Sequence, residues 1–562
     1  MITIITSLIK KSQTENIMEM VPHFVSLAML GIPICIYLSP EYDKELSMIM
    51  DFFPNVKKMN IVSLSETYVY EEYNNASTPP ELPNQRNMQK DTLESLLYSH
   101  TKHEFMENAI SANPWNSTHF AWMDIQIMDL IKNKSGIHQY LQGLNKSILS
   151  TPYLTFPGCW SKLEKDKIND VLNSVHWRFC GGFCIGDKDS MIKFCNLHRE
   201  QFPPFLKEHN KLIWDFNFWA WLETFHEDNW KPIWYRGDHN DSIFMMSSDF
   251  YTAPLSKKTT LIYDYPQIHN YYPTSAAYLY TGGKHILNTR YVNYWIYPNG
   301  CYLFNSGKQL IENKNMLSEL NQATFLPEYY KEIREQIDLP ITDGISKGIE
   351  DIRLYEVNNQ VKYVATTIGY SPTGYPRIIV GNYDIENACI IDGTVINPPY
   401  DTWSEKNWIP IIKKENNTTN TNNTTNTNID EELFIYKWSP MEIGKIDYEK
   451  KELVIVKRYP TSSPLFSKMR GSTIFQEVED GLLGVVHFSE EHGPRHYYHM
   501  LLLLDKETFA PIRYTETFCF EKLGVEFCIG FAVNKDNYMF WISRHDRDPV
   551  TIQIEKSTIK WI

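Results

Sequence analysis

The chain has 562 residues, which is too long for one hydrophobic core and predicts two to four domains. Hydrophobic residues make up 43% and aromatic residues 14% of the sequence, so global disorder is excluded. The formal net charge of -14 argues against a nucleic-acid-binding surface. An acidic chain with 35 Tyr and 15 Trp suits a neutral or carbohydrate ligand better, although most of these rings are expected to fill cores.

The first half of the chain alternates strand-like and helix-like segments, which predicts a parallel α/β sheet. We expect this α/β domain to span residues 1–262. The predicted elements are a buried strand at Ile2–Thr6, a helix at Glu15–Leu30, a strand at Pro33–Leu38, helical stretches through Asp91–Asn113 and a strand that ends at Asp124.

The second half changes to short apolar runs separated by turn residues, which predicts an all-β sandwich, barrel or propeller. At ~40–50 residues per blade, this half could hold about five or six propeller blades. We expect a five-bladed β-propeller at 285–562, preceded by a linker at 263–284 that is rich in Tyr and Pro. The polar low-complexity tract at 415–428 is expected to be a disordered surface loop.

The nine Cys residues contain no CxxC pair, so neither a disulfide framework nor a zinc ribbon is indicated. Free thiols are typical of an intracellular environment. The N-terminus lacks a basic region followed by an apolar core and a cleavage site. The longest apolar stretch, Phe24 to Leu38, is interrupted by Gly31 and Pro33 and is too short to span a bilayer. We expect a cytoplasmic protein without a signal peptide or a membrane span.

A strand-like run from His119 delivers Asp124 to its carboxyl end. Ligands of open α/β sheets bind at the carboxyl ends of strands. A carboxylate there suits a magnesium or manganese ion that is bound to a diphosphate. Taken alone the motif favours a structural interpretation, because many folds contain a buried strand that ends in Asp.

Three further clusters accompany Asp124. Thr6 and Ser7 end the first strand, where a nucleotide would bind or where an ordinary turn would begin. The stretch Phe179–Asp189 brings glycines together and predicts the wall of a pocket. Asp238 and His239 follow another strand-like run, and we favour a contribution to an oxygen-and-imidazole metal site over a structural role.

The segment from Trp214 to Glu223 predicts an aromatic helix that carries Asp215, Trp219 and Glu223 on one face. Asp215 or Glu223 could serve as the base for an acceptor hydroxyl. The alternative is a solvated helix edge, which the pattern slightly favours.

These clusters, with Met1–Ser7, Lys102–Ala109 and Asn113–Asp124, resemble the HtrL/YibB-type proteins over the first half of the chain. The resemblance implies a GT-A-like, Rossmann-type nucleotide-binding domain. It implies transfer of a sugar from a nucleotide diphospho-sugar such as a UDP-sugar, with Mn²⁺ or Mg²⁺ held by a DxD-like motif.

The same resemblance assigns roles to individual residues. Asp124 would be a metal or diphosphate ligand, and Thr6 and Ser7 would lie at the nucleotide. Lys102 would face the nucleotide or its phosphates. Gln126 stands where the second Asp of the motif would be, so a complete metal site would need Asp238 or His239.

In the second half, polar phrases such as Glu350-Asp351-Ile352-Arg353 recur among the predicted strands. Paired carboxylates with Arg are suited to glycosyl and phosphate chemistry, which makes Asp351 and Arg353 candidate catalytic residues. An internal salt bridge between them is an equally weighted alternative. The phrases resemble five-bladed propellers of mannoside phosphorylases and related mannosyltransferases, in which a Glu-Asp-x-Arg segment lies at the sugar site. Ile352 replaces the proline that is common in that segment.

Together these patterns predict a metal-assisted glycosyltransferase that moves a sugar to a glycan or another hydroxyl acceptor, with a propeller that binds or further modifies the glycan. In one alternative the propeller is the main enzyme, a glycoside phosphorylase or hydrolase. In the other the chain is a non-catalytic glycan-binding protein. The donor sugar, the acceptor and the oligomeric state do not follow from the sequence.

Overall fold

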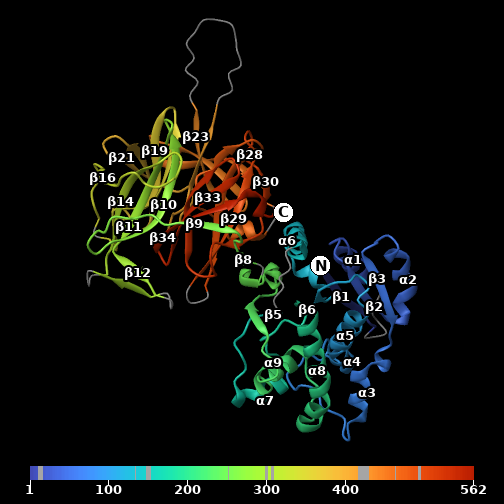
Figure 1. Ribbon diagram of the computed structural model, residues 1–562. Helices are drawn as coiled ribbons and strands as arrows, with labels where there is room; N and C mark the ends of the chain where they lie inside the picture. Colours follow the sequence, from blue (N-terminus) through green and yellow to red (C-terminus); the bar gives the residue numbers. More distant parts are fainter. Residues whose placement is uncertain are drawn as a thin grey trace. The chain divides into compact units, whose positions relative to one another are not determined.

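The computed structural model describes residues 1–10, 17–132, 134–146, 153–250, 252–297, 301–305, 309–342, 344–414, 430–461, 464–491 and 495–561. The chain divides into two compact units, Met1–Tyr251 and Thr252–Ile562 (Figure 1). The loop expected at 415–428 lies outside the described residues. Within the described part of the chain, no helix is long and apolar enough to cross a membrane.

The first unit is built on a seven-stranded mixed sheet (Figure 1). Its first four strands in the chain run parallel, β6 runs antiparallel to both of its neighbours, and β5 pairs in parallel with β7. β1 is buried along its whole length, as expected of a parallel strand that is covered on both faces. In spatial order the strands are β3 (Val56–Ile61), β2 (Ile34–Leu38), β1 (Ile2–Leu8), β4 (His119–Met123), β6 (Phe183–Asp187), β5 (Leu154–Gly158) and β7 (Ile233–Arg236).

Helices form most connections of this sheet. The helical pattern expected over Asp91–Asn113 is two helices separated at Thr101, whose hydroxyl donates to the carbonyl oxygen of Tyr98 at 2.8 Å. α9 is buried on all sides from Asp215 to Thr224, so the alternative of a solvated helix edge is wrong. The helices are α1 (Ile17–Ala28), α2 (Pro40–Met50), α3 (Tyr68–Asn75), α4 (Leu93–His100), α5 (Lys102–Ala112), α6 (Lys134–Lys146), α7 (Ile168–Asn173), α8 (Lys188–His209) and α9 (Asp215–Phe225).

The second unit consists of largely antiparallel sheets in a propeller-like arrangement (Figure 1). Three sheets come from its first part. One contains β10 (Tyr272–Thr281), β11 (Lys284–Val292), β14 (Ile311–Leu320) and β15 (Lys331–Glu332), with β17 (Ser346–Lys347) paired to β14. The second contains β16 (Arg334–Gln336), β21 (Cys389–Ile396), β20 (Arg377–Asp384), β19 (Gln360–Thr367) and β18 (Ile349–Val357), and the third is the hairpin of β12 (Tyr294–Ile296) and β13 (Tyr302–Phe304). The fourth sheet contains β22 (Ile409–Lys413), β23 (Glu431–Trp438), β24 (Met441–Asp447) and β25 (Glu452–Tyr459). The fifth contains β26 (Arg470–Gly471), β28 (Gly481–Glu490), β29 (His496–Leu504), β31 (Phe518–Cys519) and β8 (Ala253–Pro254), with β27 (Gln476–Val478) and β30 (Pro511–Tyr514) paired at its sides. The sixth contains β32 (Glu526–Val533), β33 (Asn537–Arg544), β34 (Arg547–Glu555) and β9 (Lys258–Leu261).

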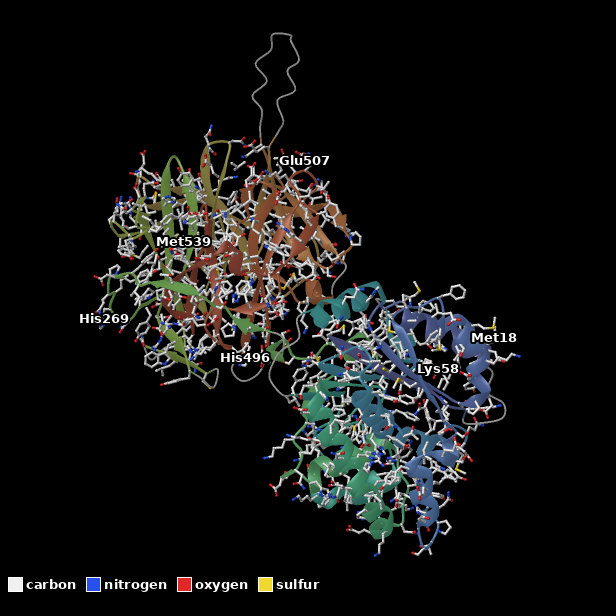
Figure 2. All side chains as sticks on the ribbon, turned by 45° about the vertical axis from the view of Figure 1, so that its right-hand side comes forward. Met18, Lys58, His269, His496, Glu507 and Met539 are labelled. Atoms are coloured by element: carbon white, nitrogen blue, oxygen red, sulfur yellow. The ribbon has the colours of Figure 1, made fainter. Side chains whose placement is uncertain are left out.

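Strands from the start of this unit complete sheets formed by its end. β8 pairs with β31 and β9 pairs with β34, which leaves fewer unpaired strand edges. The described residues of the second unit form six sheets, one of them two-stranded, so the number of sheets differs from the five blades expected. Strand residues of this unit supply its buried core, whereas connections are more exposed. Met539 of β33 is 1% exposed, and Glu507, in the connection after β29, is exposed (Figure 2).

The segment 263–284, which we expected to be a linker, contains β10 and the start of β11. Tyr263 and Tyr278 of this segment belong to a core, and Tyr278 stacks on Trp541 of β33 with ring centroids 4.8 Å apart. Their packing partners lie far along the chain, which is why composition alone suggested a linker. The two units divide between Tyr251 and Thr252 and not at residue 262.

Candidate functional sites

A cavity of about 410 Å³ opens at one edge of the seven-stranded sheet. β4 and β7 end at this edge, and the antiparallel β6 begins there, so the topology brings the residues flanking all three strands together. Several residues that line the cavity are among those selected from the sequence. They are Lys102, Asp124, Gln126, Gly181, Gly182, Asp215 and His239.

Lys102, at the start of α5, lies between two carboxylates of this cavity. Its ammonium group donates to the carbonyl oxygen of Gly181 at 2.6 Å, lies 2.8 Å from Asp215 Oδ2 and lies 3.6 Å from Asp124 Oδ1. Burial disfavours the charged ammonium, but the two carboxylates outweigh burial and raise the pKa of Lys102. Lys102 is therefore a fixed positive charge at neutral pH.

The two carboxylates differ in their access to solvent. The side chain of Asp215 is 3% exposed, and burial raises its pKa while Lys102 opposes the shift. The side chain of Asp124 is 43% exposed. Asp124 is therefore the carboxylate that a ligand can reach, whereas Asp215 forms the buried ion pair that positions Lys102.

Gly181 and Gly182 allow the chain to pass close to these charges. A Cβ atom on Gly181 would lie 3.3 Å from Lys102 Nζ, and one on Gly182 would lie 3.4 Å from Asp124 Oδ2. Asp124 is itself fixed, because its backbone N–H donates to the carbonyl oxygen of Gly182 and its Oδ1 accepts the indole N–H of Trp122 at 2.7 Å. The glycine stretch forms a wall of the cavity.

The expected metal ligands Asp124, Asp238 and His239 do not converge. Asp124 and His239 line the cavity, whereas Asp238 is not part of its lining and lies beside Cys159. Among the described residues, no group of three His, Cys, Asp or Glu side chains could hold a metal ion. Asp124 and His239 offer one carboxylate and one imidazole, a partial donor set that Mn²⁺ or Mg²⁺ would complete with phosphate oxygens and water.

Three residues expected at the site lie outside the cavity lining. Thr6 and Ser7 are at most 1% exposed, and the Ser7 hydroxyl lies 2.9 Å from the hydroxyl of Tyr98, which itself lines the cavity. Glu223 forms a buried two-pronged ion pair with Arg178 at 2.6 and 2.7 Å. Glu223 is therefore a structural partner of Arg178 and not a base for an acceptor, because its oxygens are already engaged.

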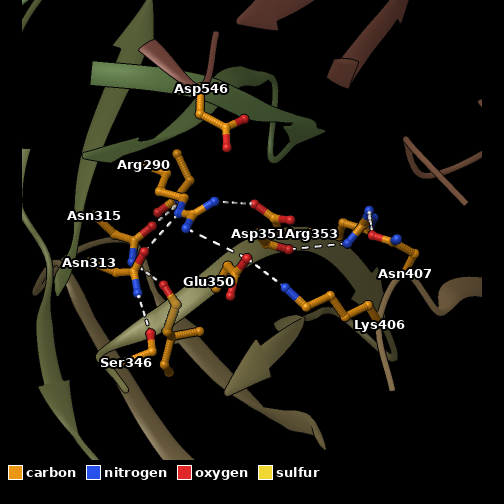
Figure 3. Close-up of polar contacts among 12 residues, drawn as sticks. Arg290, Asn313, Asn315, Ser346, Glu350, Asp351, Arg353, Lys406, Asn407 and Asp546 are labelled. Atoms are coloured by element: carbon orange, nitrogen blue, oxygen red, sulfur yellow. Dashed lines mark hydrogen bonds and ion pairs between the residues drawn. The ribbon is translucent and has the colours of Figure 1, made fainter. Parts of the chain in front are cut away.

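The second unit contains a different charged cluster, which joins β11 and β18 (Figure 3). Arg290 lies 2.8 Å from Asp351 Oδ1 and 3.6 Å from Glu350 Oε1. Lys406 donates to Glu350 Oε1 at 2.8 Å. Burial opposes ionisation of Glu350, but Lys406 and Arg290 lower its pKa to about 2. Two cations and two carboxylates thus lie in contact in a largely buried position.

Asp351 has a backbone conformation that non-glycine residues seldom adopt, with φ at 55°. The register of β18 against β19 shifts between Glu350 and Arg353, which marks a bulge. Bulges of this kind re-aim side chains and are frequent beside active sites. Here Asp351 points toward Arg290, and Arg353 points toward Asn407 (Figure 3).

Arg353 is not available to a ligand, because it is 2% exposed. Its guanidinium donates to the carbonyl oxygen of Ser472 at 2.7 Å and to Asn407 Oδ1 at 3.0 Å. Its bond to Asp351 goes to the carbonyl oxygen, at 3.2 Å, and not to the carboxylate. Burial lowers its pKa to about 10. Arg353 therefore ties loops together, which corrects both the catalytic role and the Asp351–Arg353 salt bridge expected from the sequence.

Asp546 faces the cluster from the turn between β33 and β34 (Figure 3). The hydroxyl of Tyr294 donates to Asp546 Oδ2 at 3.1 Å. Burial raises the pKa of Asp546, Arg290 opposes the shift, and Asp351 adds to it. The cluster therefore contains one carboxyl group, Asp546, whose pKa is raised and one, Glu350, whose pKa is lowered.

Sequence reasoning missed Arg290 and Asp546 and gave Lys406 no role, because each joins the cluster through residues distant in the chain. The structure shows a local signal at Asp546 that the sequence does not contain. His545 and Asp546 both have positive φ, at 54° and 53°, in a two-residue hairpin turn where Asn-Gly is the usual pair. An Asp in a conformation that favours Asn or Gly is a reason to examine its side chain.

No protein-family model and no curated protein matches this chain. Solved structures similar to it include the β-1,2-mannobiose phosphorylase from Listeria innocua, with 12% identity, coverage of 52% of this chain and 93% of that chain, and a TM-score of 0.34. A mannose phosphorylase from Leishmania mexicana has 11% identity, coverage of 55% and 92%, and a TM-score of 0.32. Mouse xyloside xylosyltransferase 1 has 9% identity, coverage of 42% and 84%, and a TM-score of 0.27. Similarity this low carries no conclusion about the function of the chain.

Proposed function

We propose that this chain is an enzyme that acts on glycans and that its propeller-like unit cleaves a glycosidic bond. The observation that carries this proposal is the cluster of Glu350, Asp351 and Asp546 with Arg290 and Lys406. Glycosidic cleavage requires a carboxylic acid that protonates the leaving oxygen and a second carboxylate. The raised pKa of Asp546 suits the proton donor, and the carboxylate of Asp351, which lies 2.8 Å from Arg290, suits the second task.

In this proposal Asp546 is the proton donor and Asp351, held by Arg290, is the second carboxylate. The proton passes from Asp546 to the glycosidic oxygen, and the bond between that oxygen and C1 breaks. Water forms the new bond to C1 and gives its proton to Asp351. If inorganic phosphate attacks in place of water, the product is a sugar 1-phosphate, and Lys406, whose side chain is 33% exposed, supplies the positive charge that attracts the phosphate.

A panel of oligosaccharides, incubated with and without inorganic phosphate, tests this proposal. Anion-exchange chromatography should show new reducing sugars or a phosphate-dependent sugar 1-phosphate. Asp351→Asn should lower turnover by about 10²-fold or more. Asp392→Asn is the matched control, because Asp392 is exposed and also has a positive φ, at 57°. No turnover by the wild type, or an unchanged rate in Asp351→Asn, would contradict the proposal.

A second function is favoured by the cavity of the first unit. We propose that this unit is a GT-A-like domain that binds a nucleotide diphospho-sugar and transfers its sugar. The supporting observation is that Lys102, Asp124 and Asp215 meet at the ends of strands, where open α/β sheets bind ligands. Asp124 and His239 would hold Mn²⁺ or Mg²⁺, which when bound neutralises charge on the diphosphate.

Within this second function, Asp215 is a positioning residue, because its carboxylate is engaged with Lys102. Titration calorimetry with UDP and Mn²⁺ tests the site. Binding should require the metal and should be weakened in Asp124→Asn, while Asp129→Asn, a change at a half-exposed carboxylate after β4, should bind as the wild type does. Absence of metal-dependent nucleotide binding would overturn the second function and leave the first untouched.

A further inference from the structure

Three exposed aromatic side chains, Tyr375, Tyr400 and Trp403, lie in two connections that meet where the backbone N–H of Glu405 donates to the carbonyl oxygen of Pro376, and we name these three the aromatic shelf. Their exposed fractions are 53%, 42% and 75%. They belong to two connections of the second unit, 371–376 before β20 and 397–408 before β22. Single exposed aromatic residues need no explanation. These three residues need one because of where they lie and because buried charged residues hold the backbone beneath them.

The aromatic shelf lies at the same end of its sheet as the charged cluster. The register pairs the start of β18 with the end of β19, the end of β19 with the start of β20, and the start of β20 with the end of β21. Both connections therefore leave the sheet where Glu350 and Asp351 lie. Lys406, three residues after Trp403, contacts Glu350 directly and lines a cavity of about 100 Å³.

Buried charges hold the backbone beneath the aromatic shelf. Arg377 is 8% exposed and donates to the carbonyl oxygens of Thr402 at 3.0 Å and Trp403 at 3.3 Å. Glu405 is 5% exposed and accepts the Thr402 hydroxyl and, at 2.9 Å, the indole N–H of Trp408. The Trp403 ring thus remains in solvent on a fixed backbone. A side chain presented in this way loses less freedom when a ligand binds.

We propose that the aromatic shelf binds a sugar unit of the glycan beyond the bond that is cleaved. This inference rests on the proposed function of the propeller-like unit. An aromatic ring can cover the apolar C–H face of a pyranose, while its hydroxyl or N–H and polar neighbours bond the sugar hydroxyls. The exposed Asp401 lies between Tyr400 and Trp403 in the sequence, and a polar neighbour of this kind suits a polyhydroxylated chain better than an apolar protein surface.

An array of short neutral oligosaccharides, probed with the full chain, tests this inference. Trp403→Ala should bind the same sugars with an apparent affinity about 3- to 10-fold weaker. Trp160→Ala, which changes an exposed Trp of the first unit, should bind as the wild type does. Tyr375→Ala provides a second variant, and equal thermal unfolding midpoints show that each variant is folded.

The outcomes separate the shelf from the reaction. Asp351→Asn should retain glycan binding although it loses turnover. Binding that needs Trp403 without any turnover by the wild type would support the shelf and overturn the proposed reaction. Unchanged affinity in folded Trp403→Ala and Tyr375→Ala, or no sugar bound by the wild type, would overturn the shelf.

Discussion

Replacement of Lys102 by Met should destabilise the first unit by about 3–5 kcal/mol at pH 7, the usual cost of removing one partner from a buried ion pair. Met retains an unbranched apolar chain but lacks the ammonium group that lies 2.8 Å from Asp215 and 3.6 Å from Asp124. Asp215, with a side chain 3% exposed, would become an uncompensated buried charge. Asp124 is 43% exposed and can be hydrated, so most of the loss should come from Asp215.

The pH dependence of this loss follows from the same geometry. Burial raises the pKa of Asp215 and Lys102 opposes the shift, so without Lys102 the pKa rises further. Asp215 then becomes neutral as the pH falls, and the destabilisation should be smaller at pH 5 than at pH 7. Adding Asp215→Asn should recover most of the loss at pH 7.

Urea unfolding followed by hydrogen exchange of α9 peptides reports on the first unit. Lys162→Met is the control, because its ion pair with Glu227 is exposed and its loss should not be measurable. Two results would refute the reasoning: equal stability of Lys102→Met and wild type at pH 7, or a loss that does not shrink at pH 5.

Acid should destabilise the first unit, because burial lowers the pKa of His100 to about 4 and that of His103 to about 3, whereas the unfolded chain binds protons below 6.5. The urea midpoint should fall as the pH falls from 6.5 toward 4, and a constant midpoint would show that these rings are not buried and neutral. Gly158→Ala should cost about 1–3 kcal/mol, because its Cβ would lie 1.8 Å from the carbonyl oxygen of Arg178; an unchanged thermal midpoint would disagree. Arg353→Met should cost about 2 kcal/mol or more by thermal unfolding, because buried carbonyl oxygens lose their donor, and a neutral effect would count against that role.

Some elements could be predicted because their local pattern matches their surroundings. The run Ile34–Leu38 is buried at every position, so an apolar run predicted the strand. The helical pattern over Asp91–Asn113 gave no sign of the break at Thr101, because the residues on both sides favour helix. The composition of 263–284 predicts a linker, because Trp541, on which Tyr278 of this segment packs, is remote in sequence.

The two sites differ in how far they could be predicted. Asp124 and His239 follow strands of one sheet, so strand-end reasoning selected two residues that line one cavity. Glu223 has the same spacing signal as Asp215, yet Arg178 engages it, and a helical period cannot reveal that partner. In the second unit the bulge at Asp351 turns its carboxylate away from Arg353, the partner expected from the sequence. The carboxylate contacts Arg290 instead, which is remote in sequence.

The central claim, that the propeller-like unit cleaves glycosidic bonds with Asp546 as the proton donor, is tested most directly by comparing two substrates of one sugar. An oligosaccharide needs protonation of its leaving oxygen, whereas a nitrophenyl glycoside does not. Asp546→Asn should lose about 10²- to 10⁴-fold in turnover of the oligosaccharide and retain most of its rate on the nitrophenyl glycoside. Equal losses on both substrates, or no loss on the oligosaccharide, would contradict the claim.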